Sequence, residues 1–301
     1  MDSGQAKKVR CLLLPAHCPL STVHCPLPWI STMLIRAMNT AATGMSANIF
    51  NLDVIANNLA NASTTSFKRS RTDFEDLYYQ TYRIPGAQDN TGQRTAIGQQ
   101  VGLGVKVSGT QQDFTQGSLL DTGKPLDLAI VGDGFFVVSD VNAPGGLLYT
   151  RNGQITRNDQ GQLVIASADR GRPLTPPITI PADATAINVS SDGQVTYLQP
   201  TSPTPTIGGC IQLAKFINNE GLLQQGDSFY SPTDASQAAL PGTPGQLGLG
   251  TVRQNFLEAS NTEPVKELVD LIKTQRHVEL NSQVVQASDQ LLQMVANLRR
   301  F

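Results

Sequence analysis

The 301-residue sequence has little charge, few aromatic residues and no long apolar run. Charged residues make up 15% of the chain and aromatic residues 6%, and the charged share lies well below the roughly one quarter found in globular proteins. The formal net charge of −2 gives none of the basic footprint of a nucleic-acid binder. No apolar run approaches the length that crosses a bilayer, so we expect no membrane insertion. A polar, weakly charged surface allows subunits to pack closely over large areas.

Cysteine is almost confined to the start of the chain. Cys11, Cys18 and Cys25 lie within residues 1–32, and only Cys210 lies beyond them. We therefore expect no disulfide framework in the main body of the chain. Cys210 is interpreted as a small buried hydrophobic residue.

Residues 1–32 differ in character from everything that follows. Four prolines interrupt their apolar residues, which does not fit a cleaved secretory signal. The run His17-Cys18-Pro19-Leu20 recurs as His24-Cys25-Pro26-Leu27, and such pairs could hold zinc, although zinc ligands usually stand closer together. We favour an extension foreign to the main body, either disordered or the result of a translation start placed too early, because Met33 opens a strongly patterned helix.

A long amphipathic helix is predicted from about residue 34 to the end of the fifties. Its apolar residues recur at alternating spacings of three and four, which is an a/d seam typical of helices that pack in a coiled coil. One face of an ordinary globular core would give the same spacing. This first seam consists of Ile35, Met38, Ala42, Met45, Ile49, Leu52, Ala56 and Leu59.

A second long helix is predicted over about residues 263–300. Asn261 or Thr262 can cap it, and Pro264 suits its first turn. A second seam recurs every seven residues and has another apolar lane beside it, so this helix can touch more than one neighbour. The second seam consists of Leu271, Val278, Val285 and Leu292, and the lane beside it of Val284, Leu291 and Leu298.

The middle of the chain is predicted to be all-β. Short runs rich in β-formers, such as 126–130 and 135–138, alternate with turn signals such as Asp192-Gly193. We assign 67–100 to an extended hairpin or loop linker and 101–260 to the β-rich domain. The fold class is then α+β, with 33–66 plus 261–301 forming a coiled-coil-like layer of long helices beside an all-β middle domain.

Several motifs, in the same order along the chain, resemble the flagellar basal-body rod and hook protein family. The first follows Ile55 and contains Asn57, Asn58, Leu59, Asn61, Thr64, Thr65, Phe67 and Lys68. Others lie at 127–136, 149–153, 216–230 and 275–292, and the runs 74–80 and 85–88 resemble the segment typical of distal-rod members. Some positions depart from the family: Ser66 stands where Gly is usual, Ser228 where Asn is usual, and His277-Val278 where Ala-Tyr is common.

The resemblance implies a non-enzymatic structural subunit of the flagellar distal rod. Such a subunit would self-assemble into a rigid helical tube that transmits torque from motor to hook, with its terminal helices inside and its β domains outside. The implied partners are other copies of the chain, proximal-rod and hook proteins, the surrounding ring proteins and the flagellar export apparatus. That apparatus would carry it to the periplasm-spanning basal body without a cleaved signal peptide.

Two alternatives remain open at this stage. One is a hook or proximal-rod protein of the same family. The other is a periplasmic polysaccharide-binding or hydrolysing β protein, which would need a cleft with paired carboxylates or exposed aromatic residues. The sequence gives no catalytic, cofactor or metal residues: Gly102-x-Gly104 and Gly132-x-Gly134 lack the spacing and lysine of a phosphate loop and are interpreted as turns.

Asn57, Asn58 and Asn61 are unusual in a predicted helix because Asn is a poor helix former. Their side chains could hydrogen-bond between subunits or could help to end the helix. We favour the first interpretation on the strength of the resemblance.

Overall fold

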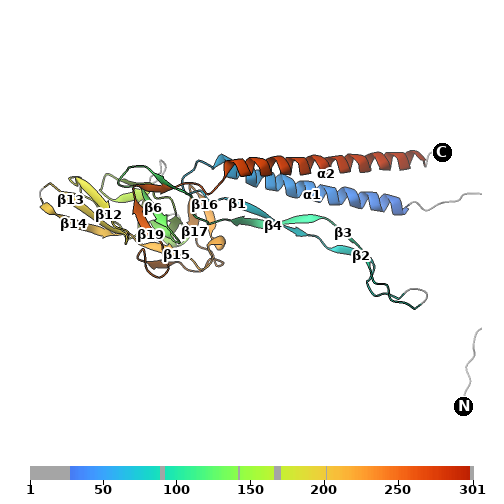
Figure 1. Ribbon diagram of the computed structural model, residues 1–301, viewed down its shortest axis with the longest axis horizontal. Helices are drawn as coiled ribbons and strands as arrows, with labels where there is room; N and C mark the ends of the chain where they lie inside the picture. The colour runs from blue at the N-terminus through green and yellow to red at the C-terminus, as the bar shows by residue number, and fades with distance from the viewer. Residues whose placement is uncertain (1–27, 89–91, 142, 166–170, 201, 299–301) are drawn as a thin grey trace, which may run out of the picture.

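The computed structural model describes residues 28–88, 92–141, 143–165, 171–200 and 202–298. The predicted extension at 1–32 therefore lies largely outside the described residues. The molecule is long and narrow, with two helices side by side at one end and a β domain at the other (Figure 1). The α+β fold class, with terminal helices packed on each other and a β-rich middle, is confirmed.

The two long helices run Pro28–Ala60 (α1) and Pro264–Leu298 (α2). The first begins before the predicted start near residue 34. Pro264 opens the second helix as predicted. Asn261 does not cap it, because the Asn261 side chain bonds the backbone of Arg69 and Asp113 instead.

A long two-stranded hairpin follows α1. Strands β1 (Ser70–Asp76) and β4 (Val105–Gln112) pair antiparallel at its root, and β2 (Tyr79–Arg83) and β3 (Gln99–Gly102) pair further out. The hairpin thus extends past the expected limit at residue 100. It projects in the same direction as the helices (Figure 1), and the Arg36 guanidinium of α1 donates to the side chains of Gln80 and Tyr82.

In the part of the β domain that the structure describes there are a six-stranded sheet, two three-stranded sheets and two strand pairs. In spatial order the large sheet holds β16 (Leu223–Gly226), β17 (Phe229–Ser231), β8 (Leu147–Thr150), β7 (Phe135–Ser139), β15 (Leu213–Lys215) and β18 (Leu240–Gly242). The smaller sheets hold β9 (Ile155–Arg157), β10 (Leu163–Ile165) and β11 (Arg172–Pro173), and β12 (Ala186–Val189), β13 (Gln194–Gln199) and β14 (Ser202–Cys210). Strand β6 (Leu128–Val131) pairs with β19 (Thr251–Gln254), and β5 (Leu119–Asp121) with β20 (Phe256–Glu258).

Strand β7 separates two hydrophobic clusters. Phe136 and Val138 face the larger cluster, whereas Phe135 and Val137 face a smaller, aromatic one, as expected when successive side chains of a strand point to opposite sides. Cys210 is only half-buried, so its interpretation as a small buried hydrophobic residue is wrong. The well-packed core therefore lies in the β domain and not between the helices.

Candidate assembly surfaces

The contact between α1 and α2 is close and includes polar side chains from both helices. A Cβ on Gly44 would stand 3.1 Å from Asn281 Nδ2, so the backbone of α1 approaches α2 tightly there. Asn51 Nδ2 donates to Thr274 Oγ1 over 3.2 Å. Ala41 and Ile55 are buried on the same face of α1. Small, hydroxyl and amide side chains therefore lie at the closest points of the contact, beside the buried Ile55.

The first predicted seam does not form this contact. From Ala42 onward, each residue of the seam comes one position after a residue that faces α2. Ala42 comes after Ala41, for example, and Leu52 after Asn51. One residue turns a helix by about 100°. Ile35 and Ile49 are accordingly 50% and 47% exposed, and the remaining seam members are exposed or half-buried. The apolar seam of α1 is thus turned away from α2.

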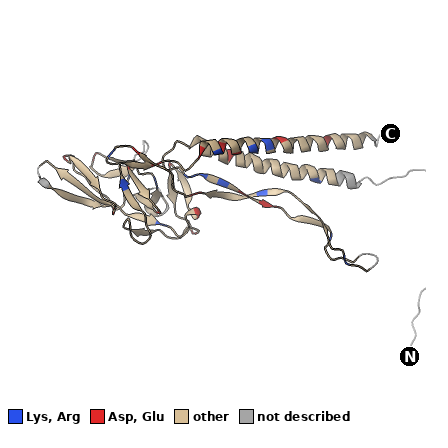
Figure 2. Ribbon diagram, viewed as in Figure 1, with Lys and Arg blue, Asp and Glu red and all other residues tan. Residues whose placement is uncertain are grey.

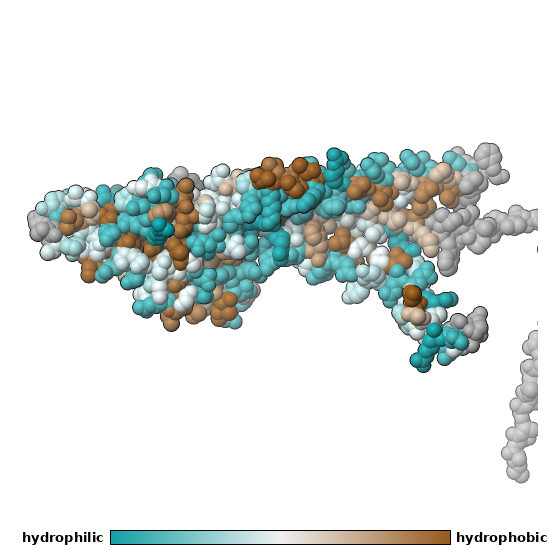
Figure 3. All heavy atoms as spheres, viewed as in Figure 1, coloured by the Kyte–Doolittle hydropathy of each residue, from teal (hydrophilic) through white to brown (hydrophobic). Residues whose placement is uncertain are grey.

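The second predicted seam lies closer to the helix contact. Leu271, Val278, Val285 and Leu292 are half-buried and alternate along α2 with buried polar residues such as Thr274 and Ser288. The lane beside the seam is exposed, with Val284 and Leu291 at 46% and 45%. Leu268, Ile272 and Leu280 add to the exposed apolar surface of this helix, which Figure 3 shows along the helix pair.

Charge is scarce along most of the helix pair. Helix α1 carries only Arg36 and Asp53, and α2 beyond residue 280 carries only Asp289 (Figure 2). The remaining charges of α2 lie in its first half, near the β domain. A weakly charged apolar surface can be buried against another helix without a large desolvation penalty.

The asparagines of the first motif mainly serve the chain itself. Asn58 is 1% exposed, and its amide accepts from Ser70 N over 2.9 Å and donates to Ser70 O over 2.8 Å. It also donates to Glu267 Oε2 of α2 over 3.3 Å. A contact between subunits is therefore wrong for Asn58. Asn61 bonds the Asn57 carbonyl at the helix end, which fits the helix-ending interpretation, and the role of the exposed Asn57 stays a prediction.

The rest of the motif leads from α1 into the β domain. Thr64 Oγ1 donates to Asn61 Oδ1 over 3.1 Å. Leu59, Thr65 and Phe67 are half-buried, and Lys68 is fully buried. Burial lowers the pKa of Lys68 below its ordinary value, although the neighbouring Glu258 carboxylate acts to raise it. The motif is thus a structural junction in which Asn58, Asn61, Thr64 and Lys68 are paired inside the chain.

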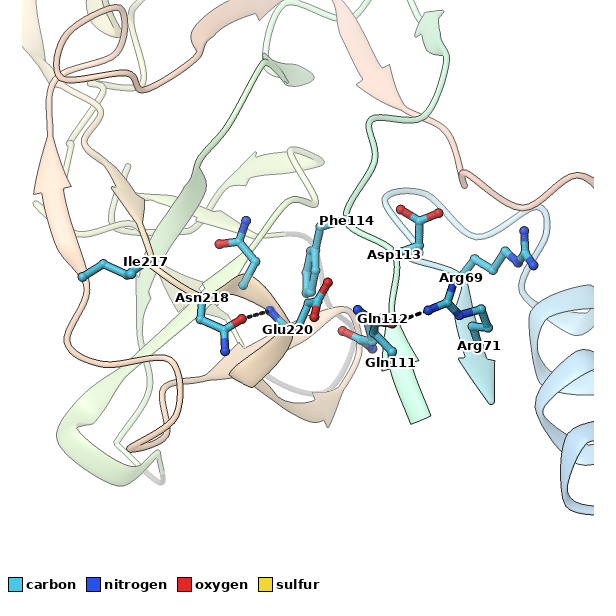
Figure 4. Close-up of a pocket in the computed structure, with 10 residues that line it drawn as sticks. Arg69, Arg71, Gln111, Gln112, Asp113, Phe114, Ile217, Asn218 and Glu220 are labelled. Carbon is cyan, nitrogen blue, oxygen red and sulfur yellow. Dashed lines mark hydrogen bonds between the residues drawn. The ribbon is translucent and has the colours of Figure 1, made fainter. Parts of the chain in front are cut away.

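A polar hollow of about 610 Å³ lies where the root of the hairpin meets the β domain (Figure 4). Arg69, Arg71 and Asp113 line one side of it, and Asn218 and Glu220 the other. Asn218 Oδ1 accepts from Glu220 N over 3.1 Å, so this side chain serves the local turn. Within the described residues, no three His, Cys, Asp or Glu side chains gather where a metal ion could bind, and no helix is long and apolar enough to cross a membrane.

Three family models match the chain in sequence order. The flagella basal body rod protein model matches residues 38–68, the FlgE/F/G D1 domain of the flagellar hook protein matches 129–197, and the C-terminal region of the FlgEFG basal body rod proteins matches 253–298. These segments contain most of α1, much of the β domain and all of α2.

Full-length relatives identify the branch of the family. The flagellar basal-body rod protein FlgG of Caulobacter vibrioides is 42% identical over 88% of this chain and 100% of its own, and that of Agrobacterium fabrum is 41% identical over 87% and 98%. The chain belongs to the FlgG family of flagellar basal-body rod proteins. The flagellar hook protein FlgE of Salmonella typhimurium is only 26% identical. The predicted distal-rod identity and the structural, non-enzymatic role are confirmed.

In this FlgG-family chain, sequence reasoning missed the junction roles of Glu258, Arg151 and Asn261, which are buried or half-buried. Glu258 and Asn261 pair with the segment that follows α1, and Arg151 pairs with Glu258. Their partners lie far away in the sequence, so no local spacing indicates the pairing. The available signal is weaker: Lys68 and Glu258 each stand among residues of strand-like pattern, where a charge needs a partner if it is buried.

Proposed function

We propose that the chain assembles into the helical tube of the distal rod through the exposed apolar faces of its terminal helices. The tube carries torque from the motor to the hook, and its other neighbours are proximal-rod, hook and surrounding ring proteins. The subunit reaches the rod through the flagellar export apparatus without a cleaved signal peptide. Membership of the FlgG family supports these assignments.

One observation carries the proposal: the apolar seam of α1 is turned away from α2. The intramolecular contact uses Gly44, Asn51 and Asn58, while Ile49 of α1 and Leu280 of α2 remain 47% and 56% exposed. The exposed faces of α1 and α2 carry different residues, so one subunit presents unlike surfaces to its neighbours. Contacts between unlike surfaces do not close on themselves and generate a helical polymer.

The test places a carboxylate on each exposed face. Ile49→Asp and Leu280→Asp should each abolish rod formation, because burying a large aliphatic side chain contributes about 1.5–3 kcal/mol and a buried unpaired carboxylate costs several more. The loss recurs at every subunit of a polymer. The melting temperature of each purified monomer should stay close to that of wild type, because both side chains are exposed in the single chain. Rods are counted by electron microscopy.

Asn39→Asp in α1 and Gln286→Asp in α2 are the matched controls, since both positions are exposed and polar. They add the same charge to the same helices and should leave rods in near-normal numbers. The proposal is wrong if Ile49→Asp and Leu280→Asp still form rods. It is equally wrong if these variants melt well below wild type, since that would put the two side chains in the core of the monomer.

A further inference from the structure

Three charged side chains meet in the interior where the helix layer joins the β domain. Lys68 Nζ lies 2.6 Å from Glu258 Oε1, and Arg151 Nε lies 3.2 Å from Glu258 Oε2. Lys68 and Glu258 are fully buried and Arg151 is 3% exposed. The Gly117 backbone N–H also donates to Glu258 Oε1 over 3.0 Å, and Lys68 Nζ donates to the Thr115 carbonyl over 2.7 Å.

Each charge comes from a different part of the molecule. Lys68 stands shortly after α1, Glu258 ends β20 shortly before α2, and Arg151 follows β8 in the β domain. One carboxylate therefore holds the exit of the first helix, the approach to the second helix and the β domain at a single point. We call this cluster of Lys68, Glu258 and Arg151 the ionic joint.

Directional hydrogen bonds surround the ionic joint. Asn261 Oδ1 accepts from Arg69 N over 2.8 Å, and Asn261 Nδ2 donates to the Asp113 carbonyl over 2.7 Å. Ser66 N donates to the Glu258 carbonyl over 2.8 Å, and Ser66 Oγ to the Arg151 carbonyl over 2.9 Å. The segments on both sides of the joint are thus fixed by bonds that tolerate little change in angle.

Stability alone does not explain such a cluster. Replacing a buried ion pair by well-packed apolar residues is often neutral or stabilising, because the charges lose their hydration. What a hydrogen-bonded charge cluster adds is a preferred geometry, whereas apolar contacts are non-directional. The helices and the β domain are joined end to end (Figure 1), so a small change of angle at the joint swings the far ends of both helices widely.

We propose that Lys68, Glu258 and Arg151 are positioning residues that fix the angle between the helix layer and the β domain, with Asn261 as their clamp. The subunit then behaves as one rigid lever. This is a property of the single chain and does not depend on the assembly surfaces proposed above, so it can fail while the assembly proposal stands.

The experiment measures the angle through a distance distribution. Spin labels are placed on Gln275 of α2 and Gln160 of the β domain, both exposed, in the full chain with Cys11, Cys18, Cys25 and Cys210 replaced by Ser. Pulsed electron paramagnetic resonance on the monomer should give one narrow distribution for the otherwise native chain. Lys68→Met should broaden it at least twofold. The control is Lys106→Met, which breaks an exposed pair with Glu75 of 2.9 Å on the hairpin and should leave the distribution narrow.

Two further variants separate positioning from stability. Lys68→Met/Arg151→Met/Glu258→Gln removes all three charges and so leaves no buried charge without a partner; it should recover much of the melting temperature lost in Lys68→Met, yet its distribution should stay broad. Asn261→Ala removes the clamp without leaving a buried charge and should also broaden the distribution, which keeps the test decisive if the Lys68 variants do not fold. The proposal is overturned if any folded joint or clamp variant gives a distribution as narrow as that of Lys106→Met.

Discussion

At the scale of single residues, two serines adopt a backbone conformation that usually belongs to Gly or Asn. Ser66 has a φ of 58° and Ser228 a φ of 62°, and at both positions the sequence departs from the family pattern. A left-handed residue with a Cβ is strained by roughly 1–2 kcal/mol relative to the right-handed form. Ser66 offsets part of this strain through its bond to the Arg151 carbonyl.

Ser228→Gly should stabilise the β domain. Ser228 follows Asp227, also of positive φ, in the two-residue turn between β16 and β17, a geometry that favours Gly at the second position. Relief of the strain, less the added flexibility of Gly in the unfolded chain, should raise the free energy of unfolding by about 0.5–1 kcal/mol. Urea unfolding measures this free energy. The control is Ser190→Gly, at an exposed turn without positive φ, which should lower the free energy of unfolding. A loss of stability in both variants would contradict the strain argument.

At the scale of elements, the sequence predicts the helices better than their contacts. The alternating spacing of Ile35 to Leu59 identifies a long helix and the residues that share a face. The spacing does not indicate which face of the helix contacts α2. Apolar residues that contact other subunits have the same spacing as apolar residues in the core of a single chain. The real contact uses Gly44, Asn51 and Asn58, residue types that a search for apolar seams passes over.

The ionic joint and the extent of the hairpin show why other features of the fold could not be predicted from the sequence. Lys68 and Glu258 are neighbours only after the β domain has folded between them, so no local pattern encodes their pairing. The hairpin root pairs β1 with β4 on two half-exposed strands, where the alternation that marks strand boundaries is weak. Family resemblance identifies the motif around Asn58. The function of Asn58 within the chain follows only from its hydrogen bonds to Ser70 and Glu267.

Hydrogen exchange on the isolated subunit should show a gradient along the helix pair. A polar contact and exposed apolar lanes stabilise the pair weakly, and single helices are marginal in water. Near the β domain the pair is held by Asn58 and Glu267. Exchange should therefore be fast at about 34–45 and 282–298, slower at about 51–60 and 264–274, and slowest in the core around β7. Protection of the free helix ends equal to that of β7 would contradict the proposed weakness of the pair.

At the scale of the whole molecule, the subunit has a packed core in the β domain at one end and the exposed apolar faces of α1 and α2 at the other. The large buried clusters lie in the β domain, and the terminal helices add exposed surface with few charges (Figures 2 and 3). Such a chain folds alone where it has a core and completes its packing against further copies.

Non-closing contacts between unlike faces make a further prediction about mixtures. A copy carrying Ile49→Asp has one damaged face and one intact face, so it can join the growing end of a rod and then prevent the next subunit from binding. Expressed beside wild type at equal level, it should reduce flagella per cell and motility well below half, since each rod needs many successive additions. Asn39→Asp expressed in the same way should leave both unchanged. If the rod grew instead from closed pairs held by two identical faces, copies carrying Ile49→Asp would be left out of pairs, and wild-type chains would assemble almost normally beside them. Counting flagella per cell in the two mixtures distinguishes these mechanisms.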